Sequence, residues 1–296
     1  MNNRIINVAS VPQLSPFRYP GGKTWLVPYL RQWLKNHEPI SEFIEPFAGG
    51  AIVGLTVAFE NLANHVTLIE RDPEVAAVWQ TILNGKADWL AKRILSFEPT
   101  GSSIRKLFAR NPRTIRDRAF ATIVRNRVQR GGILAPGAGL MKKGENKKGL
   151  KSRWYPETLA SRIRAIAEHK SRIRVERADG MHYIEKTARR KDVAYFIDPP
   201  YVTAGKRLYR YSDVDHERLF RIMTKASGDF LMTYEDTMEI RGLAIRYGFD
   251  LESIPMKNTH NQEKRELLIG RDVEWLRTSD ESSLVFPESL PQTLPA

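Results

Sequence analysis

The order of apolar and polar positions along the chain predicts an alternation of strands and helices. Short β-prone runs predict buried strands at residues 43–44, 66–69, 172–176, 193–197, 230–233, 251–255 and 266–270. Segments with apolar residues at helical spacing predict helices at residues 25–33, 51–59, 74–90 (with a break at Asn84-Gly85), 104–108, 116–128 and 157–169. Strands that alternate with helices in this way are typical of an α/β fold built on a mostly parallel sheet.

Composition narrows the class of protein. The chain has 296 residues, of which 42% are hydrophobic and 27% charged, which suits one or two globular domains. It contains no cysteine, which excludes disulfides, thiolate chemistry and cysteine-ligated zinc and fits a reducing compartment. The first residues lack the apolar core of a signal peptide, and no apolar run is long enough to span a membrane. We therefore expect a cytoplasmic protein without a membrane partner.

Positive charge is concentrated in the middle of the chain. Residues 101–175 carry 20 lysines and arginines against 4 acidic residues, whereas the rest of the chain carries 27 against 30. A basic block between nearly neutral flanks indicates a module that binds a polyanion, above all nucleic acid. A well-solvated helical insert is the alternative interpretation.

Within this block, two kinds of contact to nucleic acid are predicted. Arg127 and Arg130 lie at the end of a predicted helix, and arginine can pair with guanine in the major groove, so they are the candidates for base reading. The glycine- and lysine-rich residues 131–149 predict a flexible loop or a β-ribbon. The remaining candidates for DNA contacts are Lys142, Lys143, Lys147, Lys148 and Arg153.

The stretch Asp198-Pro199-Pro200-Tyr201 directly follows the predicted strand at residues 193–197. Prolines cannot donate a ladder hydrogen bond, so the strand ends here, and open α/β sheets bind ligands at the carboxyl ends of strands. These residue types suit methyl transfer to the exocyclic amine of a planar base. Asp198 and the Pro199 carbonyl can accept its two N–H groups, and Tyr201 offers a ring on which an extruded base can stack. A strand that ends in a turn with a solvated aspartate is the other interpretation.

Two glycine-rich turns precede this motif. Gly21-Gly22-Lys23 lies before a predicted helix and suits a carboxylate or the charged tail of a cofactor. The first glycine of the Walker pattern is missing, so a nucleotide triphosphatase is excluded. Residues 45–50 form a strand–turn–helix unit typical of mononucleotide binding, and Glu70 ends the next strand, where ribose hydroxyls are held. A surface glutamate that opens the following helix is the alternative for Glu70.

Two further segments bear on a site at the carboxyl ends of the strands. Asp179 follows the predicted strand at residues 172–176 and supplies another carboxylate at a strand end. Residues 203–215 form a polar loop with the neighbours Tyr209, Arg210 and Tyr211, and this loop is long enough to close over a site.

Taken in order, these motifs resemble those of the Dam-like adenine DNA methyltransferases of the alpha arrangement, in which cofactor motifs, target-recognition domain and catalytic tetrapeptide follow one another. The resemblance covers roughly residues 16–272. The residues from Arg18 to Lys23 are similar to the family's N-terminal cofactor loop, and those from Glu45 to Gly50 to its Glu-Pro-Phe-x-Gly motif. Asn126-Arg127 resembles its Asn-Arg-x-Gly stretch, whereas residues 233–236 only partly match its Ser-Asn-x-Asp.

The resemblance implies S-adenosylmethionine as the methyl donor and assigns roles to individual residues. The catalytic residues would be Asp198, Pro199, Pro200 and Tyr201. The residues that would hold the cofactor are Tyr19, Gly22, Lys23, Glu45, Phe47, Gly49, Glu70 (where the family usually has Asp), Asp179 and Asp198. No metal is needed for this reaction.

The resemblance also implies a Rossmann-like methyltransferase fold with an inserted, mainly helical DNA-recognition domain. We expect a catalytic and cofactor-binding domain at residues 1–80 and 176–272, a target-recognition domain at residues 81–175, and a flexible tail at residues 273–296. The expected reaction is site-specific methylation of the 6-amino group of an adenine flipped out of double-stranded DNA. We expect a monomer, and a restriction endonuclease partner would be a separate chain, since the sequence has no room for a nuclease domain.

Two alternatives of different kinds remain at this point. RNA adenine methyltransferases and the glutamine methyltransferases of release factors usually have asparagine where this chain has Asp198, and they lack a large basic insert. A DNA-binding protein with an inactive methyltransferase site is the other alternative, and the intact residues 198–201 argue against it.

Overall fold

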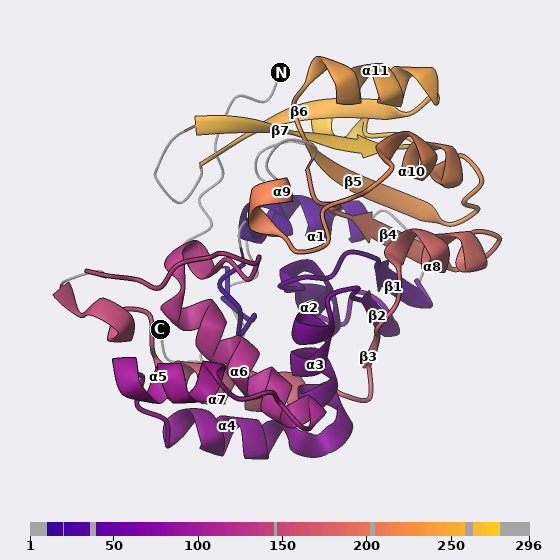
Figure 1. The fold of residues 1–296 in the computed structure, drawn as a ribbon. Coiled ribbons are helices and arrows are strands. Elements are labelled where there is room, and N and C mark those ends of the chain that lie inside the picture. The colour runs from indigo at the N-terminus through magenta and orange to yellow at the C-terminus, as the bar shows by residue number, and fades with distance from the viewer. Residues whose placement is uncertain are drawn as a thin grey trace.

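A computed structural model of the protein describes residues 11–19, 21–35, 40–144, 147–201, 205–257 and 263–278. One seven-stranded sheet organises these residues, in the order β3-β2-β1-β4-β5-β7-β6 (Figure 1). Its strands are β1 Glu42–Glu45, β2 His65–Ile69, β3 Ile173–Glu176, β4 Val193–Ile197, β5 Asp229–Glu235, β6 Asp250–Lys257 and β7 Glu263–Gly270. Each matches a strand predicted from the sequence to within a few residues. Most of the predicted tail lies outside the described residues.

The direction and order of the strands define a crevice at which a ligand can bind. Strands β1 to β5 run parallel to their neighbours, and only β7 runs antiparallel, to both β5 and β6. The chain leaves β1 towards β2 on one side, whereas β4 leads to β5 on the other side. The crevice beyond the carboxyl ends of β1 and β4 is therefore the switch point at which open α/β sheets bind ligands. The α/β, Rossmann-like fold with a mostly parallel sheet that was predicted from the sequence is confirmed.

Helices cover both faces of the sheet. Helices α1 Val27–Lys35, α2 Ile52–Phe59 and α3 Pro73–Thr81 lie on one face, and α8 Gly180–Thr187, α10 His216–Met223 and α11 Met238–Arg246 lie on the other (Figure 1). Successive side chains of a strand point to opposite faces. Phe43 and Phe196 accordingly belong to the first core, and Ile44 and Ile197 to the second. All four are fully buried, which explains the almost purely apolar strand sequences.

The chain between β2 and β3 adds a layer of helices: α4 Ala87–Leu95, α5 Gly101–Phe108, α6 Ile115–Val128 and α7 Pro156–Glu168. These helices lie beyond α2 and α3, at the bottom of Figure 1. The predicted break is present between α3 and α4, where Asn84 and Gly85 leave helical geometry and Gly85 has a φ of 78°. Leu90, Ile123 and Ile163 belong to the same buried cluster as Trp79 of α3. The helical layer therefore shares one continuous core with α2, α3 and one face of the sheet.

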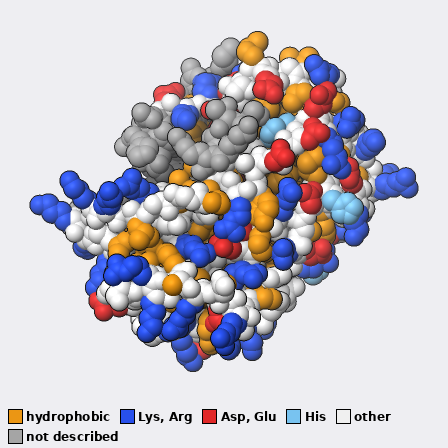
Figure 2. Space-filling view, viewed as in Figure 1, with side chains coloured by type: hydrophobic (Ala, Val, Ile, Leu, Met, Phe, Trp, Pro, Cys, Tyr) orange, Lys and Arg blue, Asp and Glu red, His pale blue; other side chains and the backbone are white. Residues whose placement is uncertain are grey.

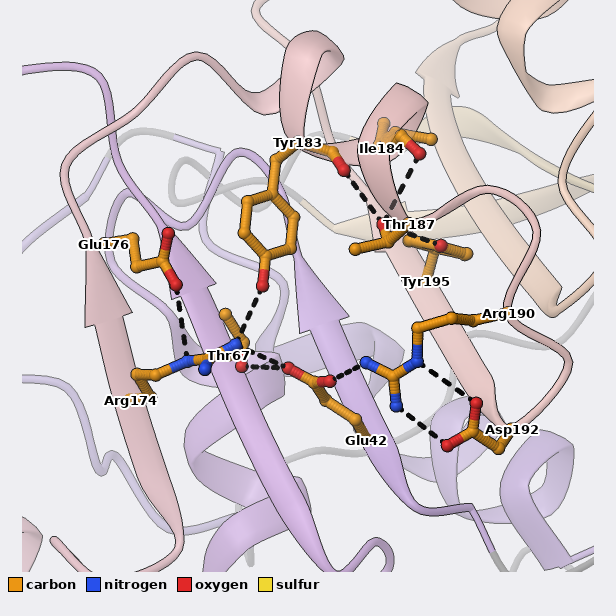
Figure 3. A network of polar contacts seen from close by, with 10 residues as sticks. All are labelled: Glu42, Thr67, Arg174, Glu176, Tyr183, Ile184, Thr187, Arg190, Asp192 and Tyr195. Carbon is orange, nitrogen blue, oxygen red and sulfur yellow. Dashed lines mark hydrogen bonds and ion pairs between the residues drawn. The ribbon is translucent and has the colours of Figure 1, made fainter.

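The amino-terminal edge of the sheet is closed by a polar network around Glu42 (Figure 3). The Glu42 carboxylate accepts hydrogen bonds from Thr67 and Arg190 and one from Arg174 Nη2 at 3.1 Å. Arg190 in turn donates to Asp192 at 3.1 and 2.8 Å. The network ties β1, β2 and β3 to the turn before β4, so it stabilises the edge opposite the ligand crevice.

No helix among the described residues combines the length and the apolar character needed to cross a bilayer.

Candidate active site

Asp198 lies where the sequence predicted it, directly after the last residue of β4. Its Oδ1 accepts a hydrogen bond of 2.8 Å from Thr233 Oγ1 on β5 and lies 3.1 Å from Lys23 Nζ. Burial raises the pKa of Asp198, Lys23 lowers it and Glu266 raises it, so that the pKa stays above its ordinary value. The carboxylate thus occupies the crevice at the switch point with one buried cation beside it.

Lys23 connects the N-terminal glycine turn with the tetrapeptide. Its buried Nζ donates to the Tyr201 hydroxyl at 2.8 Å and to the Gly21 carbonyl at 3.1 Å, and it lies 3.2 Å from Glu266 Oε2. Burial lowers the pKa of Lys23, but Asp198 and Glu266 raise it more, and the net pKa is well above the usual value. The sequence suggested that Lys23 faces a carboxylate or a cofactor tail. In the structure it faces the carboxylates of Asp198 and Glu266.

Glu266 was not recognised in the sequence. It lies near the start of β7, opposite Glu235 of β5, and Tyr201 donates to its Oε2 at 2.9 Å. Because β7 is antiparallel, its amino-terminal part reaches the same edge of the sheet at which β4 and β5 end. A glutamate directly before an apolar run was the available signal in the sequence, but only the strand order brings Glu266 to Lys23.

Tyr201 is held through both its ring and its hydroxyl. The ring lies nearly parallel to that of Tyr234, with centroids 6.3 Å apart and an interplanar angle of 21°. The hydroxyl accepts a hydrogen bond from Lys23 and donates one to Glu266, and burial raises its pKa well above the usual value. Pro199 is buried and Pro200 is partly buried beside it. The tetrapeptide is therefore anchored at the end of β4 and does not form a solvated turn.

The glycine turn after β1 is shaped by the close approach of Tyr19. A Cβ added to Gly49 would lie 2.6 Å from the Tyr19 ring, and one added to Gly50 would lie 2.8 Å from the Tyr19 Cβ. In the structure, the group that approaches these two glycines is an aromatic side chain. Phe47, in the same turn, is partly buried.

Glu45 fixes the start of this turn. Its buried carboxylate accepts the Gly54 N–H at 2.8 Å, and a Cβ at Gly54 would lie 2.6 Å from the same oxygen. Burial raises the pKa of Glu45 well above its ordinary value.

Glu70 at the end of β2 points inward. Its two oxygens accept the Gly49 N–H at 2.9 Å and the Asp72 N–H at 2.7 Å, and the residue is only 8% exposed. The alternative of a surface glutamate is therefore wrong. Burial raises the pKa of Glu70 to about 7. Asp72, and not Glu70, caps helix α3, by accepting the Glu74 N–H at 2.7 Å.

The other two predicted cofactor residues lie at the rim. Asp179 caps helix α8 by accepting the His182 N–H at 3.1 Å and lies 3.6 Å from Arg71. A Cβ on the next residue, Gly180, would lie 2.1 Å from the Pro46 carbonyl, so the start of α8 touches the turn after β1. Gly22 is exposed in the turn before Lys23.

The loop after the tetrapeptide covers these motifs, as its length predicted. Tyr209 stacks on Tyr19 with ring centroids 5.5 Å apart. Arg210 lies 3.2 Å from Glu74 and 3.9 Å from Asp72, and the Arg71 guanidinium lies over the Tyr211 ring. The helical turn α9 Gly205–Leu208 precedes these contacts, whereas residues 202–204 lie outside the described part.

The predicted DNA-binding residues fall into two groups. Arg130, Lys142, Lys143, Lys147 and Lys148 are exposed, and Arg153 is half-buried. Lysine and arginine side chains gather over the lower helices and the tip at the left of Figure 2, whereas the acidic side chains of this face lie mainly over the sheet. Leu140, in the predicted loop or ribbon, forms an antiparallel bridge with Gln129 at the end of α6.

Arg127 differs from the other basic candidates. It is 5% exposed, and its Nη2 donates to the Pro16 carbonyl. Burial and the neighbouring arginines lower its pKa to about 9. The prediction that Arg127 reads a base requires an exposed side chain, and the structure places this one inside, against the N-terminal arm. Arg130 remains the candidate at the surface.

The residues around Tyr19 fit S-adenosylmethionine by their charge. Burial raises the pKa of Tyr19 well above its usual value, and the charges that raise it further are the acids Glu70, Asp72 and Asp198. A negative, aromatic-lined position suits a sulfonium cation. Among the described residues, no group of three or more histidine, aspartate or glutamate side chains is arranged to hold a metal ion.

Comparisons with known proteins were made by sequence and by structure. No curated protein matches the chain. Solved structures with a similar arrangement include a proposed RNA methyltransferase from Pyrococcus horikoshii, at 10% identity, a TM-score of 0.39 and coverage of 86% of this chain and 85% of that one. The rRNA methyltransferase AviRa from Streptomyces viridochromogenes shares 14% identity with a TM-score of 0.36, and 85% of each chain is covered.

One family profile matches part of the sequence. Residues 19–123 match the profile of the D12 class N6 adenine-specific DNA methyltransferases. The matched segment runs from Tyr19 through the turn after β1 and Glu70 into helix α6. The members of this class methylate adenine in DNA and use S-adenosylmethionine as the methyl donor. Over residues 19–123, the chain is similar to the D12 class of N6 adenine-specific DNA methyltransferases.

Proposed function

We propose that the protein methylates adenine at a specific site in double-stranded DNA, after it has extruded the adenine from the helix. The observation that carries this proposal is the position of Asp198 at the switch point, held by Lys23 and Thr233. An adenine inside a duplex cannot bring its amine into a crevice at the end of β4, and enzymes that modify bases therefore extrude them.

Asp198 and the Pro199 carbonyl are the acceptors for the amine in this proposal. Accepting both N–H groups localises electron density on the nitrogen, whose lone pair is otherwise delocalised into the ring. Two fixed acceptors also orient that lone pair, and positioning supplies most of the rate in such a transfer. When bound, S-adenosylmethionine supplies an electrophilic methyl group on a sulfonium centre. Asp198 stabilises the positive charge that develops on the amine during the attack.

Lys23 and Tyr201 act on Asp198 and on the base. Lys23 lowers the pKa of Asp198 against the effect of burial and so favours the ionised carboxylate. The Tyr201 hydroxyl is fixed by Lys23 and Glu266, which orients the ring on which the extruded base would stack. Lys23 and Glu266 therefore fix the side chains of the catalytic motif before the substrate binds.

The residues proposed to bind the cofactor lie at the same edge of the sheet as Asp198. Glu70 accepts the Gly49 N–H and so fixes the turn after β1, and its position at the end of β2 supports a role in holding the ribose hydroxyls. Tyr19, Phe47 and Asp179 surround this turn, and Glu45 stabilises it from within. We assign Gly22 and Lys23 to the side of the cofactor that faces the base.

Residues 81–175 are the proposed target-recognition domain, with residues 1–80 and 176–272 as the catalytic domain. Four exposed lysines lie on the segment between α6 and α7: Lys142, Lys143, Lys147 and Lys148. Phosphate contacts by such residues give affinity without sequence preference, whereas Arg130 is the candidate for base reading.

An Asp198→Ala variant tests the proposal. Methyl transfer should fall by about 100-fold or more, because an acceptor aimed at developing charge is lost, while duplex binding should remain. Asp213→Asn, an exposed position on the loop after the tetrapeptide, is the control and should keep normal turnover. Near-normal turnover by a folded Asp198→Ala protein would remove Asp198 from the mechanism. Methylation of RNA but not of duplex DNA by the wild type would overturn the proposed substrate.

A further inference from the structure

One carboxylate joins the loop after the catalytic tetrapeptide to helix α6. Glu74, in the first turn of α3, accepts hydrogen bonds from Arg125 Nη1 through both of its oxygens, at 3.0 Å each. The same Oε1 lies 3.2 Å from Arg210 Nη2. Arg125 belongs to α6 and Arg210 follows the helical turn α9, so this carboxylate connects two segments that are distant in the sequence.

These three side chains, which we call the Glu74 bridge, are largely shielded from solvent. The side chains of Glu74, Arg125 and Arg210 are 16%, 26% and 29% exposed. Ion pairs between exposed side chains contribute little, whereas partly buried pairs are screened much less. The Arg125 guanidinium also lies over the Phe108 ring, 5.0 Å from its centroid, which holds it against α5. The Glu74 bridge therefore has a defined geometry.

One end of the Glu74 bridge lies beside the proposed cofactor site. Arg210 belongs to residues 205–215, the part of the loop after the tetrapeptide that we call the cover loop. The neighbouring Tyr209 stacks on Tyr19, which packs against the turn after β1. A Cβ at Gly21 would lie 3.4 Å from the Tyr209 hydroxyl, so the cover loop also touches the N-terminal glycine turn. The bridge thus holds the loop that covers this side of the crevice.

The other end lies on the helix that leads to the proposed DNA contacts. Arg125 is in the last turn of α6, and the exposed Arg130 follows this helix. The Arg130 N–H donates to the Gly139 carbonyl at 3.0 Å. The Met141 N–H donates to the Val128 carbonyl at 2.9 Å, so the lysine-bearing segment is attached to the end of α6. A duplex bound by this segment would therefore hold the helical turn that carries Arg125.

Glu74 keeps two like charges together. Arg125 Nη1 and Arg210 Nη2 lie 3.0 and 3.2 Å from the same oxygen, so they are at most about 6 Å apart. Two guanidinium groups at this distance repel each other unless a carboxylate lies between them. Asp72, 3.9 Å from Arg210 Nη1, adds a weaker contact to one of the two. Loss of the Glu74 charge should therefore separate the cover loop from α6.

We propose that Glu74 is a positioning residue that couples the binding of duplex DNA to closure of the cover loop over the cofactor. A duplex that holds α6 in place favours the bridged arrangement, and this arrangement keeps Tyr209 on Tyr19. Coupling between two sites is reciprocal, so the affinity for the duplex should also rise when the cofactor site is filled. The inference rests on the proposed function, because it takes duplex DNA and an adenosyl cofactor as the two ligands.

The test measures binding of S-adenosylhomocysteine with and without duplex DNA, by calorimetry. This probe has no methyl group to transfer, so binding is measured without turnover, and the duplex carries the sequence that the wild type methylates. In the wild type, the duplex should lower the dissociation constant of the probe by about 5-fold or more, the lower end of typical coupling between sites. In Glu74→Gln, Arg125→Gln and Arg210→Gln, this factor should fall towards one.

Glu60→Gln is the matched control. Glu60 accepts hydrogen bonds from Arg31 at 2.8 and 2.6 Å, and its side chain is 14% exposed, but this pair joins α1 to the end of α2. The variant removes a carboxylate of similar burial and should keep the wild-type factor. The double variant Arg125→Gln/Arg210→Gln should lose no more coupling than either single variant, because each substitution alone already breaks the Glu74 bridge.

The possible failures can be told apart. If Glu74→Gln changes the affinity for the probe equally with and without duplex, the ion pairs are only structural and the proposal is overturned. A wild type that methylates the duplex but binds the probe equally well without it also overturns the proposal and leaves the function intact. A wild type that neither binds nor methylates duplex DNA overturns both. If Glu74→Gln does not fold, Arg125→Gln and Arg210→Gln decide the outcome, because each leaves Glu74 in place.

Discussion

Among the active-site residues, the loss of the Lys23 charge should lower the free energy of unfolding most. Asp198 Oδ1 and Glu266 Oε2 lie 3.1 and 3.2 Å from its Nζ, so these oxygens are at most about 6 Å apart, and like charges at that distance repel by about 3 kcal/mol at an effective dielectric constant of about 20. In Lys23→Met, both carboxylates remain in the crevice without a cation. Removing one member of a buried ion pair typically lowers the free energy of unfolding by about 3–5 kcal/mol.

A second substitution should restore part of this loss. Glu266→Gln removes one of the two repelling charges, so Lys23→Met/Glu266→Gln should be less destabilised than the sum of the single variants. We expect a coupling energy of about 2–3 kcal/mol, the upper range for residues in direct contact. The assay is urea unfolding of the four proteins, followed by circular dichroism at neutral pH.

The exposed pair Lys92 and Asp88 provides the control. Its atoms are 2.7 Å apart, but the side chains are 72% and 59% exposed, and such a helical pair contributes only about 0.3–0.5 kcal/mol. The matched cycle with Lys92→Met and Asp88→Asn should therefore show little coupling. Equal coupling energies in the two cycles would refute the claim that burial makes the Lys23 ion pairs strong.

The same variant makes a prediction about pH. Burial raises the pKa of Asp198 and Lys23 lowers it, so the loss of Lys23 should raise it further. If the ionised carboxylate is the acceptor for the amine, activity is lost as pH falls through this pKa. The acid limb of the rate profile of Lys23→Met should therefore lie at higher pH than that of the wild type. An unmoved limb would separate Lys23 from the ionisation of Asp198.

Two further predictions concern Glu70 and Glu42. Glu70→Ala should weaken binding of S-adenosylmethionine, because each lost charge-assisted hydrogen bond is worth up to about 1.5–3 kcal/mol; an unchanged dissociation constant in calorimetry would contradict it. At Glu42, burial raises the pKa, but hydrogen bonds from Thr67 and Arg190 offset this, and the net pKa is lowered. A lowered pKa contributes stability that is present above the ordinary glutamate pKa and lost as pH falls through the folded value. Glu42→Gln should therefore cost about 1.5–3 kcal/mol at neutral pH, and urea unfolding at falling pH should show the difference from the wild type disappear.

Much of the fold was predictable because its signals are local. Buried strands such as β4 are short, apolar and ended by prolines, and the helices carry their own periodicity and caps. The carboxyl ends of the parallel strands then place Asp198 and Glu70 on one edge of the sheet, as the sequence indicated. The break at Asn84-Gly85 was equally local, since Gly85 adopts a positive φ.

The parts that could not be predicted depend on contacts between distant segments. Glu266 reaches Lys23 only because β7 inserts between β5 and β6 in the antiparallel direction. Arg127 is buried because the N-terminal arm, more than 100 residues earlier in the chain, folds onto α6 and offers it a carbonyl. The sequence of a helix end rich in arginine is the same whether or not the arm covers it, so it does not predict which arginines are buried.

The most direct test of the central claim is to identify the modified base and its surroundings together. DNA from cells that express the wild type or Asp198→Ala is sequenced with a readout of modified bases, and its nucleosides are analysed by mass spectrometry. The wild type should produce N6-methyladenine at one recurring sequence in duplex DNA, and Asp198→Ala should produce none. Methylation that persists in Asp198→Ala, or a wild type that leaves adenine unmodified, would contradict the account.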